Sequence, residues 1–422
     1  MSFRKNCGRL ALALCLSVGF MGGGDADAAD RASVSSTRVD LVRRIHEPDY
    51  GKEKAGDVKQ AMEKKAVEKK VEKKDAEGMM MRRWEVESRD TGGTLLFSDS
   101  PEYVSRDGIL YADTVSGDAR ILYYHLNDTD QRKKVAVVLQ NPQDVPATVT
   151  VTRGGDSAPS EDYLKVGKAT QTAYFRSRMH DVIHLKPGEK RLLRTAMDQR
   201  VLRPGQLVYG VYDFSAANKV KVSVIMYPEN VSPYVFIEGA KVLPKDEQRL
   251  RGTFHGMDRV ITSVKPYDGA KEGAVYIPLV DDVWDTYREG VDATDGSKVV
   301  NCGNYGVSYR LQIPTAGNGR TKYALSPLGG VYAGAMVARV SQGNPHVFLT
   351  PSGRTYFGDR AVSDKEYAAM ENAREQGFEL LTETTEQADL GDYANFVPVT
   401  FEFSPPGASN LPVNFILMPA NP

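Results

Sequence analysis

The chain has few cysteines, and where they lie matters more than how many there are. Cys7 and Cys15 fall within the first 29 residues, and Cys302 is the third and last. If the amino-terminal segment is removed on export, a single cysteine remains. We therefore expect no disulfide within the mature chain.

An excess of charge of one sign is absent, and so is a long hydrophobic run in the body of the chain. The 54 Lys and Arg residues are matched by 55 Asp and Glu residues, so no overall field draws the protein to nucleic acid or anionic lipid. Mean hydropathy is -0.40, and no later segment is apolar enough to span a bilayer. We expect a soluble mature chain without a nucleic-acid partner or a transmembrane segment.

Recognisable catalytic, cofactor and metal motifs are also missing. There is no Gly-x-Ser-x-Gly, no phosphate-binding glycine loop, and no histidine close to Cys302 in the sequence. His180 and His184 are four residues apart, but the turn that follows favours a strand, which separates them by about 13 Å. Met79–Met81 is expected to pack on the first domain rather than hold copper. We predict no catalytic residue, no cofactor and no metal site.

The first 29 residues do carry a clear pattern. Three basic side chains within the first nine residues precede an apolar run from Leu10 to Met21, too short for a comfortable membrane anchor. Ala26 and Ala28 then place small residues where a signal peptidase reads, just before Ala29. This pattern predicts a signal peptide over residues 1–28 and a secreted, extracytoplasmic protein, at the cell surface or in the periplasm.

Residues 29–90 are expected to form a polar leader. Its central part, Lys52–Glu77, holds nine lysines and seven acids with few other residue types. The apolar stripe along this segment is narrower than a globular helix needs, and the heptads of a coiled coil are absent. We predict a solvated, fraying helix that serves as a spacer.

Short apolar or alternating runs separated by turn residues fill the chain after Trp84. Residues 220–226 alternate apolar and polar side chains, which is typical of a sheet with one wet face. Lys186–Glu189 supplies a Pro-Gly turn between two runs, which predicts a hairpin. Nine such runs without an intervening helix predict an antiparallel β-sandwich, Ig-like or jelly-roll-like, over residues 91–230.

Residues 231–422 predict a second antiparallel β-sandwich with one short helix. Ser363 and Glu366 form a capping box at the start of that helix, and Gly377 ends it. The last two strands are expected to form a hairpin around Pro405–Gly407. The predicted fold class is therefore mainly β, with two antiparallel sandwich domains after a charged helical or disordered leader.

Three acids surround one of the two tryptophans just after a predicted strand. Acids in a loop at a sandwich end could bind calcium, and a tryptophan with neighbouring tyrosines could stack on a sugar. The acid spacing matches no recognised calcium loop, and a glycosidase would need two acids at a fixed separation across a cleft. The candidate ligand-binding residues are Trp284, Tyr276, Tyr287, Asp281, Asp282 and Asp285.

Two parts of the sequence carry a family resemblance. One is Gly93–Glu102 together with Tyr123–Asn127, and the other is Asn304–Tyr309 together with Gly329–Ala335. They resemble secreted Firmicute-type bacterial proteins often labelled copper amine oxidase N-terminal-domain proteins, over roughly residues 90–420.

The resemblance does not imply amine oxidation. Amine oxidases convert the tyrosine of Asn-Tyr-Asp/Glu into their quinone cofactor, beside a His-x-His copper pair. Here Tyr305 precedes Gly306, and no two histidines are spaced by two. The resemblance therefore implies no site residues in this chain.

The sequence leaves three interpretations of function open. We expect an exported, non-enzymatic protein of the cell envelope or the extracellular space that binds or bridges envelope polysaccharide or other surface proteins. One alternative is a carbohydrate-binding module that uses Trp284 as a stacking platform. Another is a hydrolase that depends on Asp281, Asp282 and Asp285.

Overall fold

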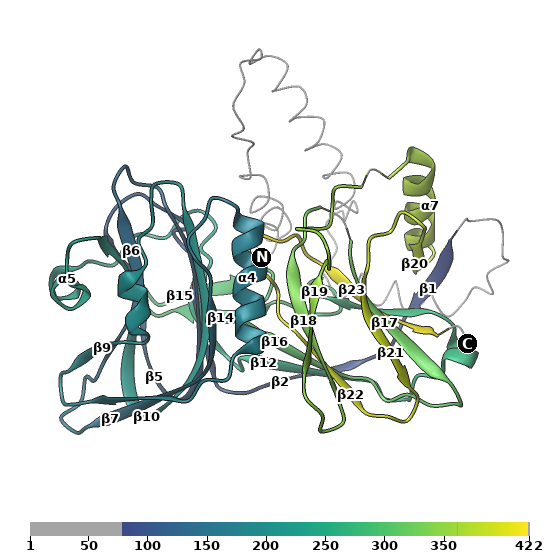
Figure 1. The fold of residues 1–422 in the computed structure, drawn as a ribbon, viewed down its shortest axis with the longest axis horizontal. Coiled ribbons are helices and arrows are strands. Elements are labelled where there is room, and N and C mark those ends of the chain that lie inside the picture. Colours follow the sequence, from purple (N-terminus) through teal and green to yellow (C-terminus); the bar gives the residue numbers. More distant parts are fainter. Residues whose placement is uncertain (1–77, 329, 361, 421–422) are drawn as a thin grey trace, which may run out of the picture.

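The computed structural model describes residues 78–328, 330–360 and 362–420. The predicted signal peptide and most of the predicted leader lie outside these residues. The described chain is mainly β, as the sequence predicted, with three sheets and four α-helices. The sheets form two lobes with helix α4 (Tyr163–Arg176) between them (Figure 1). Within the described residues, none of the helices combines the length and apolar character that crossing a membrane requires.

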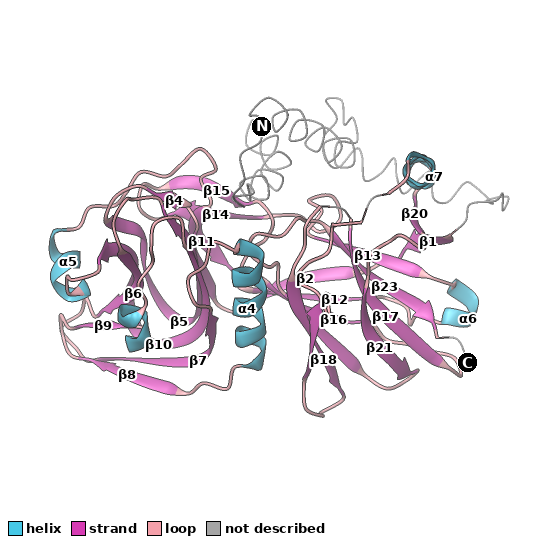
Figure 2. Cartoon of the chain, turned by 45° about the horizontal axis from the view of Figure 1, so that its top comes forward, coloured by secondary structure: helices cyan, strands magenta, loops and turns pink. Residues whose placement is uncertain are grey.

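The first lobe is built on two long antiparallel strands, β5 (Gly108–Asn127) and β10 (Leu207–Pro228). The sequence pattern predicts each of them as two shorter strands, at residues 109–112 and 120–126 for the first and at residues 207–214 and 220–227 for the second. The first half of β10 also pairs with β7 (Ala147–Asp156), and the second half pairs with β6 (Lys133–Gln140). Because β6 and β7 share one edge of β10, the sheet curves around a single apolar core (Figure 2).

Strands from three other parts of the chain complete this 11-stranded sheet. Three of these strands come from beyond residue 250, so the hydrogen bonding of the sheet crosses the expected domain boundary at residue 230. The remaining strands are β3 (Thr94–Ser98), β4 (Tyr103–Val104), β8 (Asp181–Leu185), β9 (Lys190–Leu192), β11 (Arg251–His255), β14 (Arg288–Asp292) and β15 (Ser297–Asn301).

The second lobe consists of two six-stranded sheets. One sheet holds β1 (Met79–Arg83), β13 (Val275–Leu279), β17 (Arg320–Pro327), β20 (Phe378–Leu381), β21 (Ala388–Ala394) and β23 (Val413–Pro419). The other holds β2 (Glu87–Thr91), β12 (Asp258–Thr262), β16 (Ser308–Gln312), β18 (Gly334–Val340), β19 (His346–Thr350) and β22 (Val399–Phe403).

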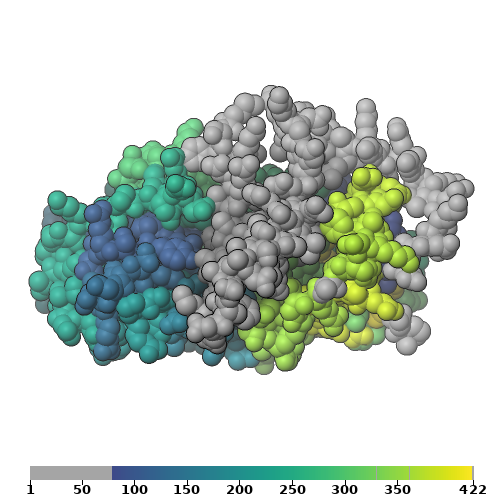
Figure 3. All heavy atoms as spheres, turned by 90° about the horizontal axis from the view of Figure 1, so that it is seen from above, coloured from purple at the N-terminus to yellow at the C-terminus, as the bar shows by residue number. Residues whose placement is uncertain are grey.

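Aromatic side chains fill the core between these two sheets. Tyr323 on β17 lies 4.7 Å from Phe401 on β22, and Phe401 lies 5.0 Å from Phe415 on β23, measured between ring centroids. In Figure 3 the blue and teal residues of the first half gather at one end of the molecule, and the yellow-green residues of the last third gather at the other.

The last part of the predicted leader is folded into the second lobe. Strand β1 pairs with β13 and β20, and β2 pairs with β12. Trp84 between them is fully buried, edge-on to Tyr267 at 5.6 Å. Met81 packs with Leu381 and Ile416. The expectation that Met79–Met81 packs on the first domain is therefore wrong, because the strand that contains them joins a sheet of the second lobe.

Helix α4 is the main element that the sequence did not predict. The expectation that residues 91–230 contain no helix between the strands is therefore wrong. Asp162 caps it by accepting a hydrogen bond from the Lys165 N–H at 3.0 Å. Gly167 faces the second lobe, where a Cβ would lie 2.3 Å from the Gly407 carbonyl oxygen. Glycine and threonine lower the intrinsic helix propensity, so burial between the lobes stabilises this helix.

The predicted second-lobe helix is confirmed as α7 (Asp364–Glu375) with its capping box. The Ser363 hydroxyl accepts from the Glu366 N–H, and Gly377 follows the helix with a φ of 82°. The remaining helices are α5 (Pro233–Gly239), α6 (Gly269–Glu272) and the 3-10 turn η1 (Thr195–Gln199).

Neither expected hairpin forms, although both connections are present. Strand β8 pairs with β7 whereas β9 pairs with β6, on either side of the Lys186–Glu189 turn. Strands β22 and β23 lie in different sheets, and residues 404–412, of which 404–411 are buried, cross between the lobe's two sheets. Most strand pairs are antiparallel, but β1–β13, β3–β5, β4–β5 and β12–β16 are parallel. A turn signal fixes where the chain reverses, and the core decides which neighbour each strand pairs with.

Candidate functional site

The predicted acidic loop after β13 is held in shape by its own acids. Asp281 Oδ1 accepts hydrogen bonds from the backbone N–H groups of Val283, Trp284 and Asp285 at 3.1, 2.9 and 2.8 Å. Burial raises the pKa of Asp281 to about 6, which these hydrogen bonds oppose. This carboxylate therefore closes a turn rather than facing a ligand.

The other two acids serve the same loop. Asp282 has a φ of 55° and accepts from the Tyr287 N–H at 2.9 Å. Asp285 accepts from the Val280 N–H at 2.6 Å and forms an ion pair with Arg259 of β12. Burial raises the pKa of Asp285, while the arginine lowers it. The three predicted acids therefore lie in one loop, and each of them accepts a hydrogen bond from a backbone N–H group of residues 280–287.

The three predicted aromatic residues lie near the loop but pack in different directions. Trp284 is half-buried, and the Arg83 guanidinium lies 3.5 Å from the centroid of its ring. Tyr276 packs on the small cluster around Met81, whereas Tyr287 packs on the large core cluster to which both lobes contribute. Burial raises the pKa of both tyrosines. The structure does not assemble the three rings into one flat platform, and their ligand-binding role stays a prediction.

A serine and a histidine, a pair used in nucleophilic catalysis, are hydrogen-bonded inside the first lobe. Ser98 Oγ lies 2.9 Å from His125 Nε2, and His125 Nδ1 lies 2.9 Å from the Pro101 carbonyl oxygen. Because a carbonyl only accepts, Nδ1 donates and Nε2 accepts from the serine. Both side chains are fully buried, and burial lowers the pKa of His125 to about 4. The pair therefore contributes a hydrogen bond to the interior of the first lobe.

Because His125 is buried in its neutral form, we expect it to make the free energy of unfolding depend on pH. The contribution of His125 to the free energy of unfolding should fall by about 3 kcal/mol between pH 6.5 and pH 4, because the unfolded imidazole takes up a proton that the buried one rejects. Stability is complete above the unfolded pKa and is lost as pH falls toward the folded value. In His125→Gln this loss should disappear, which urea unfolding at a series of pH values measures.

The control for this prediction is His346→Gln, which changes an exposed ring of β19. It should leave the acid branch of the stability curve as in the wild type. If the curve of His125→Gln runs parallel to that of the wild type, buried His125 is not the cause of the acid sensitivity.

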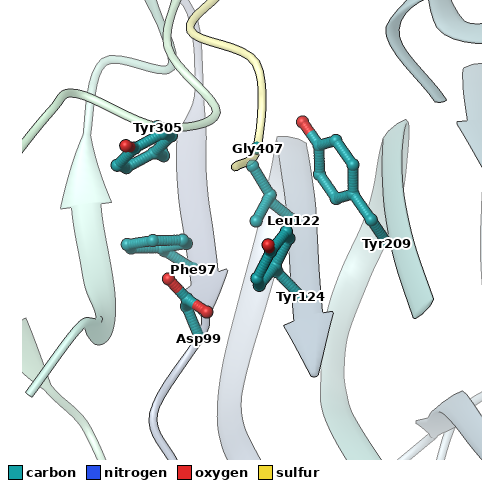
Figure 4. Close-up of a pocket in the computed structure, with 7 residues that line it drawn as sticks. All are labelled: Phe97, Asp99, Leu122, Tyr124, Tyr209, Tyr305 and Gly407. Carbon is teal, nitrogen blue, oxygen red and sulfur yellow. The ribbon is translucent and has the colours of Figure 1, made fainter. Parts of the chain in front are cut away.

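A small cavity of about 10 Å³, room for a single water-sized sphere, lies where the two lobes meet. Asp99 points toward the space between Phe97 and Tyr124 (Figure 4). The Oδ1 atom of Asp99 is buried and has no hydrogen-bond partner within the part of the chain that the structure describes. The lining residues, all buried, are Phe97, Asp99, Leu122, Tyr124, Tyr209, Tyr305 and Gly407.

Two further acids surround Asp99. Burial and the charges of Glu102 and Asp246 raise the pKa of Asp99 well above its usual value. Burial and Asp246 also raise the pKa of Glu102 to about 7. Asp246 accepts from the Ser100 hydroxyl at 2.7 Å and from the Glu102 N–H at 2.9 Å. Three acidic side chains are thus concentrated beside the cavity.

Arg120 of β5 joins the two lobes beside this region. Its guanidinium donates to both carboxylate oxygens of Asp213 at 2.6 and 3.0 Å and to Asp258 of β12 at 3.0 Å. It also donates to the carbonyl oxygens of Met257 and Gly306 at 2.7 and 3.0 Å. With all its nitrogens engaged and 2% exposed, Arg120 is a fixed structural cation.

Helix α4 adds neutral and ionic contacts across the same junction. Lys168 donates to the carbonyl oxygens of Pro351 and Arg354 at 2.6 and 2.9 Å. Gln171 Oε1 accepts from the Ala335 N–H of β18 at 2.9 Å. On β7, Arg153 forms an ion pair with Glu402 of β22. The two lobes therefore meet through buried polar contacts on several elements.

No known family model matches the chain, and neither does any curated protein sequence. Within the described residues, no group of three or more His, Cys, Asp or Glu side chains is arranged to hold a metal ion. Cys302 is buried and disulfide-bonded. The expectation of no disulfide concerns the chain without residues 1–28 and stays a prediction.

Sequence reasoning missed Asp99, Arg120 and His125. The sequence does carry a signal for two of them. Arg120 directly precedes the apolar run Ile121–Leu126, and His125 lies within it. A polar side chain in such a run is expected to be buried, and a buried polar side chain needs a hydrogen-bond partner. Asp99 has no such signal. It follows a strand in a Ser-Asp-Ser sequence that reads as an exposed turn.

Proposed function

We propose that the protein is exported and acts at the cell surface or in the periplasm as a non-enzymatic binding or structural protein. The amino-terminal pattern of residues 1–28 supports export. The main structural support is that groups of catalytic type, His125 with Ser98 and the acids of residues 281–285, make hydrogen bonds that hold the fold. Such a molecule offers a rigid surface to a partner.

The proposed partners are envelope polysaccharide or other surface proteins. A family resemblance also supports this proposal. Residues 90–420 resemble secreted proteins labelled as copper amine oxidase N-terminal-domain proteins, and the resemblance implies export without oxidase chemistry. Nearly balanced charge supports a partner that is not nucleic acid.

Carbohydrate binding is the more specific form of this proposal, and one observation favours it. Trp284 is half-buried in an ordered loop, so part of its indole is accessible while Arg83 holds it in place. A fixed, partly exposed aromatic side chain loses little conformational entropy when a sugar stacks on it.

The hydrolase alternative has less support. Acid catalysis on a glycoside requires two carboxyl groups that reach the substrate from opposite sides. Asp281 and Asp285 instead accept hydrogen bonds from the backbone of their own loop, and Asp285 is also paired with Arg259. Replacing Asp281, Asp282 and Asp285 by alanine should therefore lower thermal stability without removing any specific turnover in a hydrolase screen.

Retention on isolated envelope fractions tests the proposal. We expect the purified protein to co-sediment with at least one of three fractions, namely peptidoglycan, envelope polysaccharide or whole cells stripped of the protein. If Trp284 contacts a sugar, Trp284→Ala should weaken retention by about fivefold, since stacking on an aromatic side chain is worth about 1 kcal/mol.

The matched control is Phe396→Ala, which removes an exposed aromatic side chain elsewhere in the second lobe. This variant should be retained as the wild type is. Equal retention of both variants would end the carbohydrate form of the proposal. Absence of retention on every fraction would contradict the proposal itself.

A further inference from the structure

Asp99 is a buried carboxylate that faces aromatic rings instead of a partner. The residue is 3% exposed, and its N–H donates to the Leu250 carbonyl oxygen at 3.0 Å. Its Oδ1 atom, by contrast, accepts no hydrogen bond from any described residue. A buried carboxylate oxygen without a donor is costly, so a bound group that supplies a donor or a positive charge stabilises it.

The charges around Asp99 have the same sign. The groups that act on its ionisation are Glu102 and Asp246, both acids. Arg251, a buried cation of β11, is directed elsewhere, since its Nε donates to Asp292 at 2.8 Å and its Nη1 donates to carbonyl oxygens. The surroundings of the cavity therefore favour a cation.

The aromatic rings add to this preference. Phe97 and Tyr305 are stacked at 6.2 Å with an angle of 29° between their planes, and Tyr124 meets Tyr209 at 5.7 Å and 64°. These four residues and Asp99 surround one space (Figure 4). The faces of aromatic rings are negative and attract weakly hydrated cations.

We propose that this cavity between the lobes binds an ammonium group, either the free ammonium ion or the head group of a primary amine. The group donates a hydrogen bond to Asp99 Oδ1 and lies against the rings of Phe97 and Tyr124. The cavity of about 10 Å³ accepts one water-sized sphere, which excludes a quaternary ammonium group. Calcium requires six or more oxygen ligands, and an aromatic lining does not provide them.

Ammonium binding at this site is linked to the release of a proton. Burial and the charges of Glu102 and Asp246 raise the pKa of Asp99. An ammonium group beside Oδ1 favours the ionised carboxylate and lowers that pKa, so it competes with the proton for the same oxygen. Affinity therefore rises with pH until Asp99 is ionised without the ligand, and stays constant above that point.

The test compares thermal unfolding of the full chain in different chloride salts at about pH 8, at equal ionic strength near 0.1 M. Ammonium chloride should raise Tm by about 2 °C relative to sodium chloride, and tetramethylammonium chloride should not. Methylammonium chloride distinguishes the two sources, because it stabilises the protein only if the site admits the head group of an amine.

Asp99→Asn keeps the shape of the side chain and removes its charge, so it should fold and should lose the ammonium effect. Gly407→Ala provides a second, independent variant, because its Cβ would lie 2.8 Å from the Tyr124 ring and reduce the cavity. An ammonium effect that survives in both variants, or an equal effect of tetramethylammonium, would overturn the proposal. Neither result bears on retention at the envelope, so the two proposals are tested separately.

Discussion

Arg120→Met is expected to lower the free energy of unfolding by about 3–5 kcal/mol. The arginine contributes five donors to two carboxylates and two carbonyl oxygens, and its side chain is 3% exposed. Without it, Asp213 and Asp258 remain buried with less compensation. Urea unfolding followed by circular dichroism measures the loss.

The matched control is Arg310→Met, which removes a half-exposed arginine 3.8 Å from the same Asp258. This change should cost less than about 1 kcal/mol, since exposed ion pairs contribute little. Comparable losses in the two variants would mean that Arg120 is not the group that compensates the buried acids between the lobes.

Trp84→Ala is expected to cost about 3–5 kcal/mol, a loss comparable to that of Arg120. Trp84 connects β1 to β2, is fully buried, and has Tyr267 edge-on to its ring. Its indole also lies under Arg82 and Lys265, whose charged groups are 5.1 and 4.7 Å from the ring centroid. Denaturant unfolding of the full chain measures the change.

The second tryptophan provides the control for the first. Trp284 is half-buried and stacked on Arg83, so Trp284→Ala should cost about 1 kcal/mol. If Trp84→Ala were as mild as Trp284→Ala, the segment from residue 78 to residue 91 would not be an integral part of the second lobe.

Much of the local structure could be predicted from the sequence. The mainly β fold follows from alternation such as that of residues 220–226, and helix α7 follows from Ser363 and Glu366. These signals are local, because they depend on side chains within one turn or one strand.

Strand pairing and the unpredicted helix α4 depend on contacts between distant residues. The Pro-Gly turn at Lys186–Glu189 is present, yet β8 and β9 pair with β7 and β6 because the curved sheet offers each of them a different edge. Helix α4 contains Gly167 and Thr170, which a propensity argument counts against a helix. Its buried side between the lobes outweighs that cost.

In the candidate sites too, local features could be predicted from the sequence, whereas features that depend on the backbone conformation or on distant residues could not. The position of Asp281, Asp282 and Asp285 in a loop after a strand was predicted, but the direction of their oxygens depends on positive φ angles at Val280 and Asp282. No pattern indicates such angles. The cavity at Asp99 forms only when the crossing segment with Gly407 reaches β3 from the other end of the chain.

Buried contacts through Arg120 and helix α4 are expected to make the two lobes a single cooperative unit. Hydrogen exchange with mass spectrometry across a urea series tests it directly, because it reports on β10 of the first lobe and β23 of the second in one experiment. We predict that amides in both strands exchange through the same global opening, with the same free energy and the same dependence on urea. If one lobe opened at distinctly lower urea than the other, the claim would be contradicted.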